Sequence, residues 1–375
     1  MPLRRIASAL LVLFAIAAHA QQQPTVSRKQ ALQRVQAGVT ALQRWYVQRT
    51  GLYQTTGWWN SANAITMLVD AMRTGLPRSN ESILTNTLTQ AQIVVPKSEQ
   101  TGELEKMTGA PNFLNEYYDD EGWWAMAWID AYDLTGKPQY LAAAQTIFRD
   151  MQGAWDNTCG GGIWWSKKRH YKNAIANELF FDVSASLARR GTRADKTEAL
   201  AWATKEWTWF QSTGMINADH LVNDGLEINK EDGTCHNNKR TVWTYNQGVV
   251  LGALSEYARA THSSQPLTDA RTLADAGLAH LTDNNGILHD PCEPKCGSDA
   301  NQFKGIFVRN LRILNRTLQE PRYRASFATN ANSIWLNART DKDELGVRWS
   351  GPPVELNAGT QVSALDALVA AAADR

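Results

Sequence analysis

The sequence predicts an all-α protein in which six helical hairpins close into a ring. Apolar residues recur at helical spacing along most of the chain, and no strand-rich block interrupts them. Helices with one apolar face alternate with helices that are apolar on nearly all sides, which favours an outer and an inner layer. The second helix of each hairpin opens with polar and aromatic residues, at steps of 59, 54, 73, 58 and 57 residues between Asn60, Asp119, Asn173, Asn246, Lys304 and Gln361.

The first helix of each hairpin is amphipathic. In the first one, Ala31, Val35, Val39 and Leu42 recur at the spacing of a single helix face. Polar residues fill the positions between them, so this helix can bury only one side. We expect outer helices over residues 26–48, 80–93, 138–152, 196–211, 267–281 and 323–338.

The second helix of each hairpin is rich in small and apolar residues and poor in charge, so it should be more deeply buried. Gly75 and Pro77 end the first of these helices, and Gly136 and Pro138 end the second. In a closed ring every inner helix points the same way, so their N-termini converge on one face. We expect inner helices over residues 58–72, 115–132, 171–187, 244–260, 301–318 and 360–372.

Long loops precede four of the inner helices and should lie on that same face, over residues 97–114, 153–170, 213–242 and 284–300. Loops of this length in a compact domain are usually functional.

Composition excludes several classes of function. The 375 residues are 43% hydrophobic and 20% charged, which is typical of a globular protein. A net charge of +1 gives no general attraction to nucleic acid or anionic lipid. The seven histidines and four cysteines lack the spacing of a zinc site, and no phosphate-binding loop or nucleophile elbow is present. We therefore expect neither a metal nor a cofactor.

The first twenty residues have the pattern of a signal peptide. Arg4 and Arg5 precede an apolar run over residues 6–18, and Ala18-His19-Ala20 is a small-x-small cleavage site. The run is too short to span a membrane comfortably, and no later segment is long and apolar enough to do so. We expect cleavage after Ala20 and export of residues 21–375 as a single domain and a monomer, to the periplasm or out of the cell.

Export makes disulfide bonds expected for the four cysteines. Cys292 and Cys296 are four residues apart in one loop and favour a local pair. This pairing leaves Cys159 with Cys235, although four cysteines allow three connectivities.

Tryptophan is unusually frequent, with 15 residues, and several occur in adjacent pairs. Successive residues of a helix point about 100° apart, so both members of a pair cannot face one apolar side. At least one member is free to face a groove. The pairs are Trp58-Trp59, Trp123-Trp124 and Trp164-Trp165.

Two adjacent acids, Asp119 and Asp120, stand directly before one of these tryptophan pairs. Two carboxyl groups cleave a glycosidic bond: one protonates the leaving oxygen, and the other attacks or activates water. Neighbours on a helix reach the roughly 5–5.5 Å separation that gives retention more easily than the wider separation that gives inversion. Two carboxyl groups this close together also raise the pKa of one of them, and a proton donor needs a raised pKa. Glu121 is a rival for either role, and helix capping is the structural alternative.

Polar and aromatic residues near the N-termini of the inner helices, and Asp224 in the predicted loop over residues 213–242, are candidates for holding a sugar. Internal hydrogen bonding in a wide barrel is the alternative explanation for the polar ones. We expect substrate contacts from Asn60, Trp123, Trp124, Asn177, Asp224, Tyr245, Asn246 and Lys304.

Four motifs give the chain a specific resemblance. They are Tyr-Tyr-Asp-Asp-Glu-Gly-Trp-Trp (117–124), Cys-Gly-Gly-Gly-Ile-Trp-Trp (159–165), Asn-Ala-Ile-Ala-Asn-Glu-Leu-Phe (173–180) and Thr-Tyr-Asn-Gln-Gly-Val (244–249). Together they make the mature chain similar to glycoside hydrolase family 76, the bacterial and fungal α-1,6-mannanases. The resemblance implies an (α/α)6 barrel and retaining hydrolysis of internal α-1,6-mannosidic bonds of mannan. It further implies that Asp119 is the nucleophile, Asp120 the acid/base and Asp224 a substrate-binding acid.

Other functions fit the same fold. A hydrolase or epimerase for another sugar would keep the barrel, because helical toroids host many reactions. An epimerase would need histidines on the inner helices. The histidines of this chain lie in the predicted loops or outer helices, which counts against that function. Transfer of sugar in place of hydrolysis, as the resemblance to fungal relatives in cell-wall assembly suggests, is a further alternative and leaves the acceptor open. A protein that binds glycans without cleaving them would use Asp119 and Asp120 only to hold hydroxyl groups.

Overall fold

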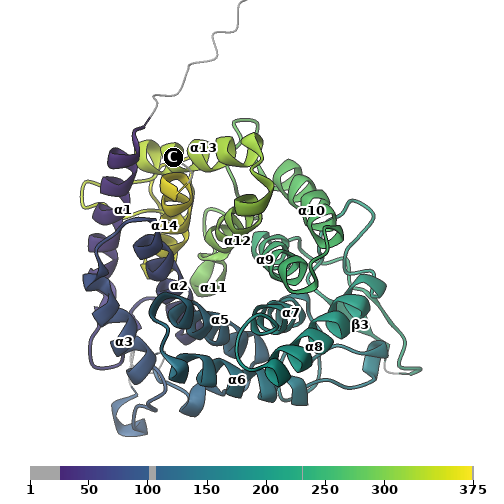
Figure 1. Cartoon of the computed structure of the whole chain (residues 1–375). Coiled ribbons are helices and arrows are strands. Elements are labelled where there is room, and N and C mark those ends of the chain that lie inside the picture. Colours follow the sequence, from purple (N-terminus) through teal and green to yellow (C-terminus); the bar gives the residue numbers. More distant parts are fainter. Residues whose placement is uncertain (1–25, 101–106, 230, 374–375) are drawn as a thin grey trace, which may run out of the picture.

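The computed structural model describes residues 26–100, 107–229 and 231–373, and the predicted signal peptide lies outside them. Six helices form a closed inner ring in which each packs against the next and the last returns to the first. Figure 1 looks down this ring. The inner helices are α2 (Trp58–Thr74), α5 (Tyr118–Thr135), α7 (Ala174–Leu187), α9 (Thr244–Thr261), α12 (Phe303–Leu318) and α14 (Ala358–Ala373).

Six further helices surround the ring (Figure 1). Each packs mainly on an inner helix next to it in sequence, except that α1 packs on α14 and so joins the two ends of the chain. The outer helices are α1 (Arg28–Leu42), α3 (Glu81–Gln90), α6 (Pro138–Gly153), α8 (Arg193–Ser212), α10 (Gln265–Leu281) and α13 (Pro321–Asn337). The predicted all-α double ring, an (α/α)6 barrel, is confirmed.

Burial follows the predicted division of the layers. Every residue of α7 is buried, whereas α6 buries one stripe that includes Tyr140, Ala144 and Ile147. The buried apolar side chains of both layers form one continuous cluster. None of the described helices is long and apolar enough to cross a membrane.

Short elements complete the described chain. Strands β1 (Tyr46–Val47) and β2 (Leu52–Tyr53) form one antiparallel hairpin. Strands β3 (Leu226–Ile228) and β4 (Cys235–Asn237) form another, with Glu227 opposite His236. The small helices are α11 (Gly297–Ala300) and the 3-10 turns η1 (Gln43–Trp45), η2 (Arg78–Asn80), η3 (Lys97–Glu99), η4 (Pro111–Phe113) and η5 (Thr158–Gly160).

Several helix ends differ from the prediction. Helix α1 stops at Leu42 rather than residue 48, because η1 and β1 follow it. Helix α7 starts at Ala174 rather than residue 171, because the Asn173 side chain caps it by accepting a hydrogen bond from the Ala176 backbone N–H. The shorter α7 leaves Tyr171 in the preceding loop.

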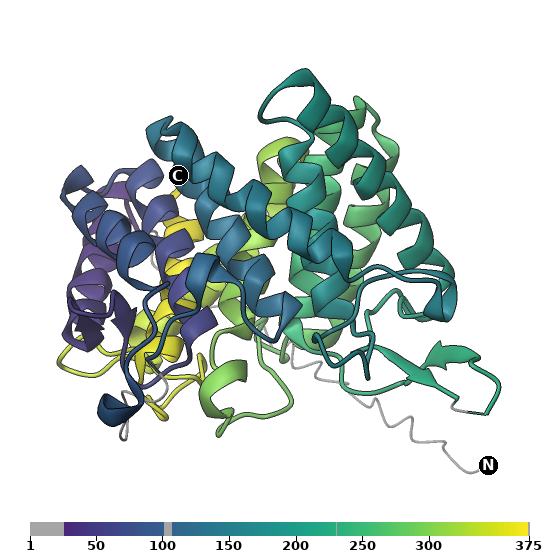
Figure 2. The same cartoon turned by 90° about the horizontal axis from the view of Figure 1, so that it is seen from below.

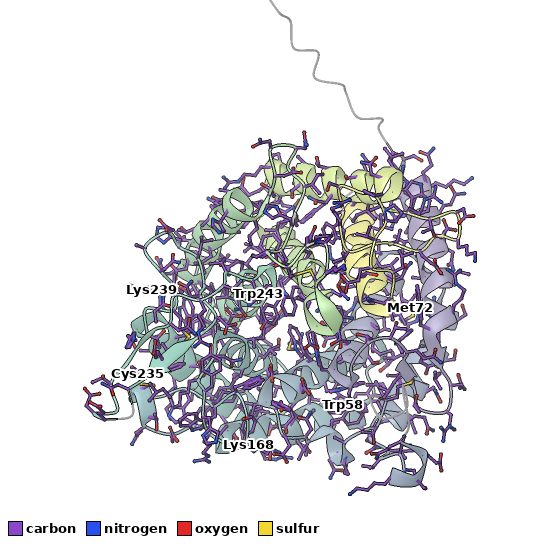
Figure 3. All side chains as sticks on the ribbon, turned by 180° about the vertical axis from the view of Figure 1, so that it is seen from behind. Trp58, Met72, Lys168, Cys235, Lys239 and Trp243 are labelled. Atoms are coloured by element: carbon purple, nitrogen blue, oxygen red, sulfur yellow. A yellow bond between two sulfur atoms is a disulfide. The ribbon has the colours of Figure 1, made fainter. Side chains whose placement is uncertain are left out.

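The loops that precede the inner helices gather on one side of the barrel (Figure 2). There the β3–β4 hairpin and α11 stand out from the helices. Figure 3, viewed from behind Figure 1, shows Cys235, Lys239 and Trp243 along the segment that leads into α9. Disulfide bonds join Cys159 to Cys235 and Cys292 to Cys296, which ties the loop before α7 to strand β4 and closes a short loop before α11.

Candidate active site

A pocket of about 490 Å³ lies on the loop side of the ring. Residues at or just before the N-termini of five inner helices line it, as the common direction of the inner helices requires. Its lining consists of Trp59, Tyr117, Asp119, Asp120, Trp123, Trp165, Tyr171, Asn173, Asp224, Tyr245, Asp299 and Phe303.

Asp119 and Asp120 lie side by side in the first turn of α5, partly buried at this pocket. Oδ2 of Asp119 accepts a hydrogen bond from the indole N–H of Trp165 at 3.0 Å. Its other oxygen, Oδ1, is buried and has no hydrogen-bond partner among the described residues. Oδ2 of Asp120 accepts a hydrogen bond from the side-chain amide of Asn115 at 2.6 Å.

Both carboxyl groups hold a proton more tightly than a free aspartate does. Burial raises the pKa of Asp119 to about 7, against hydrogen bonds from Trp165 and the backbone that lower it. Burial raises the pKa of Asp120 well above its usual range, and the neighbouring Asp119 raises it further. The two carboxyl groups therefore resist being ionised together, so one of the pair keeps a proton near neutral pH.

Glu121, the rival acid, does not line the pocket. It is fully buried, accepts a hydrogen bond from the backbone N–H of Asn115 and forms an ion pair with Lys167 at 3.0 Å. Burial and nearby Asp150 raise the pKa of Glu121 to about 9. Its contacts anchor the segment before α5 to the following loop, so we assign it to structure.

The glycine-rich loop before α7 carries Trp165 to the pocket, and a buried lysine organises it. The ammonium group of Lys172 donates hydrogen bonds to the carbonyls of Thr158, Gly161 and Gly162 at 2.8, 2.6 and 2.9 Å. A Cβ on Gly162 would lie 2.2 Å from the Trp209 ring, so no side chain fits there. The loop is thus fixed from both sides.

Asp224 forms another wall of the pocket. Its Oδ2 accepts a hydrogen bond from the Tyr171 hydroxyl at 2.6 Å, and its backbone carbonyl accepts one from Ala174 at the start of α7. Gly225 allows this approach, because a Cβ there would lie 2.5 Å from the Tyr171 hydroxyl. Burial raises the pKa of Asp224, although the Tyr171 hydrogen bond opposes the shift.

Aromatic rings surround the acids. Trp59 stacks on Trp123 with ring centroids 5.6 Å apart, and the Trp59 indole N–H donates to Asp299 at 3.2 Å. Tyr245 stacks on Phe303 at 3.7 Å. Carboxylates beside flat aromatic faces suit a sugar, whose hydroxyl groups need polar partners and whose C–H faces pack on rings.

One tryptophan of each adjacent pair lines the pocket, namely Trp59, Trp123 and Trp165. The other member is buried in each case: Trp58, Trp124 and Trp164. The argument from helix geometry holds for the two pairs on helices, whereas Trp164 and Trp165 lie in a loop. The selection of Trp124 as a substrate contact was wrong. Trp124 packs against Trp58 and Phe113 in the core, because it points away from the pocket that Trp123 faces.

Of the other predicted contacts, Asp224 and Tyr245 reach the pocket with the aspartate pair. Four polar residues do not, and the prediction of direct substrate contact is corrected for them. They are fully buried, and three of them satisfy backbone or side-chain groups of neighbouring loops and helices. Asn60 bonds Gly57 and Gln302, Asn177 bonds Ile163, Lys304 bonds Glu293 and Val347, and Asn246 has no hydrogen-bond partner among the described residues.

Seven lining residues were not predicted. Trp59 and Trp165 carried a signal as members of tryptophan pairs. Asn173 opens the motif over residues 173–180, and Tyr171 stands two residues before it. Asp299 gave no signal, because the four-residue helix α11 that carries it has no sequence pattern. The seven are Trp59, Tyr117, Trp165, Tyr171, Asn173, Asp299 and Phe303.

No group of His, Cys, Asp and Glu within the described parts of the chain could hold a metal ion. The pocket instead offers carboxyl groups that none of the described lysines and arginines neutralises at ion-pair distance. Such groups can exchange protons and attack an electrophilic carbon, which is the chemistry of glycoside cleavage.

Comparisons with known proteins agree with this geometry. The chain is 28% identical over 336 residues to mannan endo-1,6-alpha-mannosidase DCW1 of Eremothecium gossypii, covering 82% of this chain and 70% of the relative. Saccharomyces cerevisiae DFG5, of the same description, is 26% identical over 349 residues, covering 86% and 72%.

Solved structures share the fold. A protein from Listeria innocua matches with a TM-score of 0.76 at 27% identity, covering 91% of this chain and 97% of that one. An alpha-1,6-mannanase of Salegentibacter sp. HEL1_6, inactivated at two consecutive aspartates and bound to alpha-1,6-mannotriose, matches with a TM-score of 0.79 at 22% identity, covering 92% and 100%. The model of glycosyl hydrolase family 76 matches residues 29–375, and the chain belongs to that family.

Proposed function

We propose that this chain is an endo-acting α-1,6-mannanase that cleaves mannan with retention of configuration. Family membership supports glycoside hydrolysis, and the relatives described as mannan endo-1,6-alpha-mannosidases support the linkage and the position of cleavage. The observation that carries the proposal is the adjacent pair Asp119 and Asp120 in an aromatic pocket. It is the sole Asp-Asp pair in the sequence, and the Salegentibacter mannanase was inactivated at two consecutive aspartates.

In this proposal Asp119 is the nucleophile. Its carboxylate attacks the anomeric carbon while Asp120 donates its proton to the leaving glycosidic oxygen, which gives a mannosyl-enzyme ester and a shortened chain. Asp120, now ionised, takes a proton from water, and that water displaces Asp119 from the anomeric carbon. The hydrogen bond from Trp165 stabilises the Asp119 carboxylate and suits the first role, and the raised pKa of Asp120 suits the second.

The remaining pocket residues would hold the substrate. Asp224 accepts hydrogen bonds and suits sugar hydroxyl groups, while Trp59, Trp123 and Tyr245 offer flat faces to the C–H side of a pyranose. Exposed Tyr117 and Trp165, with ring centroids 5.0 Å apart, extend this aromatic surface to the rim.

The proposal includes the setting of the enzyme. We infer a single catalytic domain over residues 21–375, exported as a monomer to the periplasm or the medium after loss of residues 1–20. The disulfide bonds Cys159–Cys235 and Cys292–Cys296 support an oxidising compartment. Sequencing the N-terminus of the exported protein tests the cleavage site, and a first residue other than Gln21 would move it.

Incubation with linear α-1,6-mannan tests the activity. Release of α-1,6-linked oligosaccharides by the unmodified protein, and its loss in Asp119→Asn and Asp120→Asn variants, is the expected result. Binding of the mannan without cleavage would leave a glycan-binding protein. Cleavage of a different α-linked glycan alone, or products longer than the donor chain, would redirect the proposal to another hydrolase or to a transglycosylase.

A further inference from the structure

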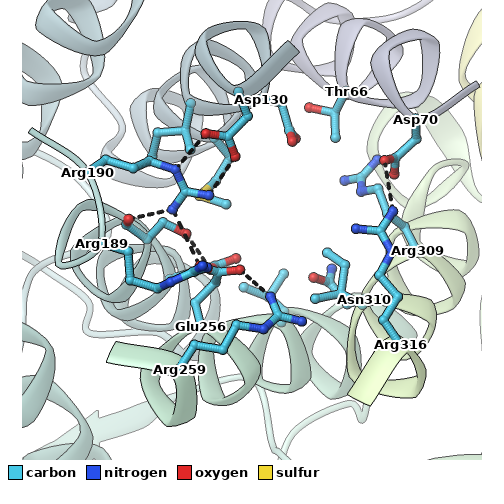
Figure 4. Close-up of a pocket in the computed structure, with 18 of the residues that line it drawn as sticks. Thr66, Asp70, Asp130, Arg189, Arg190, Glu256, Arg259, Arg309, Asn310 and Arg316 are labelled. Atoms are coloured by element: carbon cyan, nitrogen blue, oxygen red, sulfur yellow. Dashed lines mark hydrogen bonds and ion pairs between the residues drawn. The ribbon is translucent and has the colours of Figure 1, made fainter. Parts of the chain in front are cut away.

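The ring has a second cavity at its other end, also about 490 Å³ in volume (Figure 4). Residues of α2, α5, α7, α9 and α12 line it, together with Arg189 and Arg190 just after α7. It is separate from the catalytic pocket, yet the two share one wall residue, Trp123. Nothing in the proposed catalytic mechanism uses this rear cavity.

The rim of the rear cavity is built from paired charges (Figure 4). Arg73 lies 2.7 Å from Asp130, and Arg190 lies 2.6 Å from Asp133. The four other lining arginines, Arg189, Arg259, Arg309 and Arg316, also have an acid within 4.0 Å.

Six arginines face five acids in the described lining, and the C-termini of the inner helices add partial negative charge. The rim therefore favours neither an anion nor a cation. It does offer many hydrogen-bond donors and acceptors side by side.

Deeper in the cavity, polar atoms lack partners. Asp182 is 4% exposed, and none of the lysines and arginines in the described segments lies within 4.0 Å of it. It forms one long hydrogen bond, with the Ser186 hydroxyl at 3.4 Å. Asn310 is 5% exposed; its amide group donates to the Ile306 carbonyl, and its Oδ1 accepts no hydrogen bond. Buried polar atoms of this kind call for a ligand or water.

Gly252 opens the space between these two side chains. A Cβ at this position would lie 2.1 Å from Oδ1 of Asn310 and 3.5 Å from Oδ2 of Asp182. Figure 4 shows Thr66 and Asn310 on different sides of the cavity, so hydroxyl and amide groups converge from α2 and α12. Apolar Trp123 and Val249 also contribute to the lining.

We propose that the rear cavity binds a neutral saccharide. The volume lies in the range of small-ligand sites and suits about one or two hexose units. Hydroxyl groups both donate and accept hydrogen bonds, which matches a rim of paired arginines and acids and the partnerless atoms of Asp182 and Asn310. The apolar patches at Trp123 and Val249 face the C–H groups of the sugar. An occupant contacts the wall residue that the rear cavity shares with the catalytic pocket.

Titration of α-1,6-mannotriose into the Asp120→Asn protein tests this proposal. The choice of mannotriose rests on the proposed function, whereas the site does not. We expect two binding sites per chain, and one site after the further change Asp182→Leu, which removes the acceptor and fills the cavity. Ser184→Ala is the matched control, because Ser184 is a buried residue of α7 outside the cavity lining. It should keep both sites.

One site in the parent protein, or two sites that survive Asp182→Leu, overturns the proposal. If inorganic phosphate displaces the second mannotriose, the rear cavity prefers an anion, and the proposal of a neutral ligand is overturned. Crystals of the Asp120→Asn protein soaked in mannotriose give an answer that does not depend on how the Asp182 variant folds, and an empty rear cavity at full front occupancy contradicts the proposal. Failure of the proposed function is recognised separately, as an absence of mannan cleavage by the unmodified chain.

Discussion

Asp70 at the rear of the ring and Asp119 at the front are both buried acids, but their pKa values shift in opposite directions. At the rear, Asp70 pairs with Arg312 and lies 3.6 and 3.7 Å from Arg73 and Arg316. Although burial raises it, these arginines hold the pKa of Asp70 at about 2. At the front, burial raises the pKa of Asp119 to about 7, and no described lysine or arginine lies within ion-pair distance of it.

Both acids lie on inner helices, so the fold alone does not decide their protonation. For these two acids the difference lies in the arginines: three surround Asp70, and none of the described ones pairs with Asp119. A carboxylate held by arginines contributes to stability but is not free to exchange a proton near neutral pH. The front acids lack that compensation and are therefore suited to acid–base work, at a cost in stability. The following changes test this contrast, beginning with the largest expected effect.

Asp120→Asn should lower kcat/KM on α-1,6-mannan by about 10³-fold, since the amide has no proton to give to the leaving oxygen. The melting temperature should stay the same or rise, because the repulsion between Asp119 and Asp120 disappears. Initial rates and thermal unfolding measure both quantities. A variant that unfolds at a lower temperature and keeps its activity would show that Asp120, like Asp70, stabilises the fold and does not take part in catalysis.

Asp70→Asn should show the reverse pattern. It leaves Arg312 buried without a charged partner, which costs about 3–5 kcal/mol of unfolding free energy. Activity per folded molecule should change little, because Asp70 lies at the far end of the ring. Chemical denaturation with a parallel activity assay measures both quantities. A loss of activity without a loss of stability would contradict the structural role that we assign to Asp70.

The cost of Asp70→Asn should also depend on pH. The pKa of Asp70 is lowered from 3.8 to about 2 in the folded protein, so its stabilisation is present above pH 3.8 and is lost as pH falls through about 2. Denaturation of both proteins at neutral pH and near pH 2 should show the difference in unfolding free energy shrinking. A difference that is constant over this range would mean that the ion pair is not its source.

Lys172→Met should release the glycine-rich loop that carries Trp165. Three carbonyls lose their charged donor, which costs about 1–3 kcal/mol. We expect lower thermal stability and a lower kcat/KM together. Lys168→Met is the matched control: Lys168 is an exposed lysine of the same loop (Figure 3), and its replacement should change neither quantity.

Trp165→Phe should have the smallest effect, a shift in the pH profile. The indole N–H stabilises the Asp119 carboxylate, so its loss raises the pKa of Asp119 and moves the acidic limb of kcat/KM to higher pH. Trp164→Phe removes an equivalent indole N–H from Asp156, outside the pocket, and should leave the limb in place. Equal shifts in both variants would contradict this assignment.

Much of the fold was predictable because helix periodicity and apolar content are local. The alternation of amphipathic and apolar helices led to the double ring, and the ring placed Asp119, Asp224 and Tyr245 on one face. Helix ends were less predictable. The cap formed by Asn173 and the short strand β1 depend on contacts that no local pattern encodes.

The site was only partly predictable, for a geometric reason. A polar residue near the start of a buried helix can face the pocket or a neighbouring loop, and Asn60 and Asn177 took the second option. Asp299 entered from a four-residue helix, and the rear cavity joins charges from several separate helices. Such groupings exist only after packing, so sequence spacing does not reveal them.

The most direct test of the central claim is the configuration of the first product. Proton NMR during cleavage of α-1,6-mannan by the unmodified protein distinguishes the anomers before they equilibrate. If Asp119 and Asp120 act as an adjacent nucleophile and acid/base pair, the α-anomer of the new reducing end appears first. Initial appearance of the β-anomer would contradict the account, because it requires direct attack by water and a wider separation of the acids.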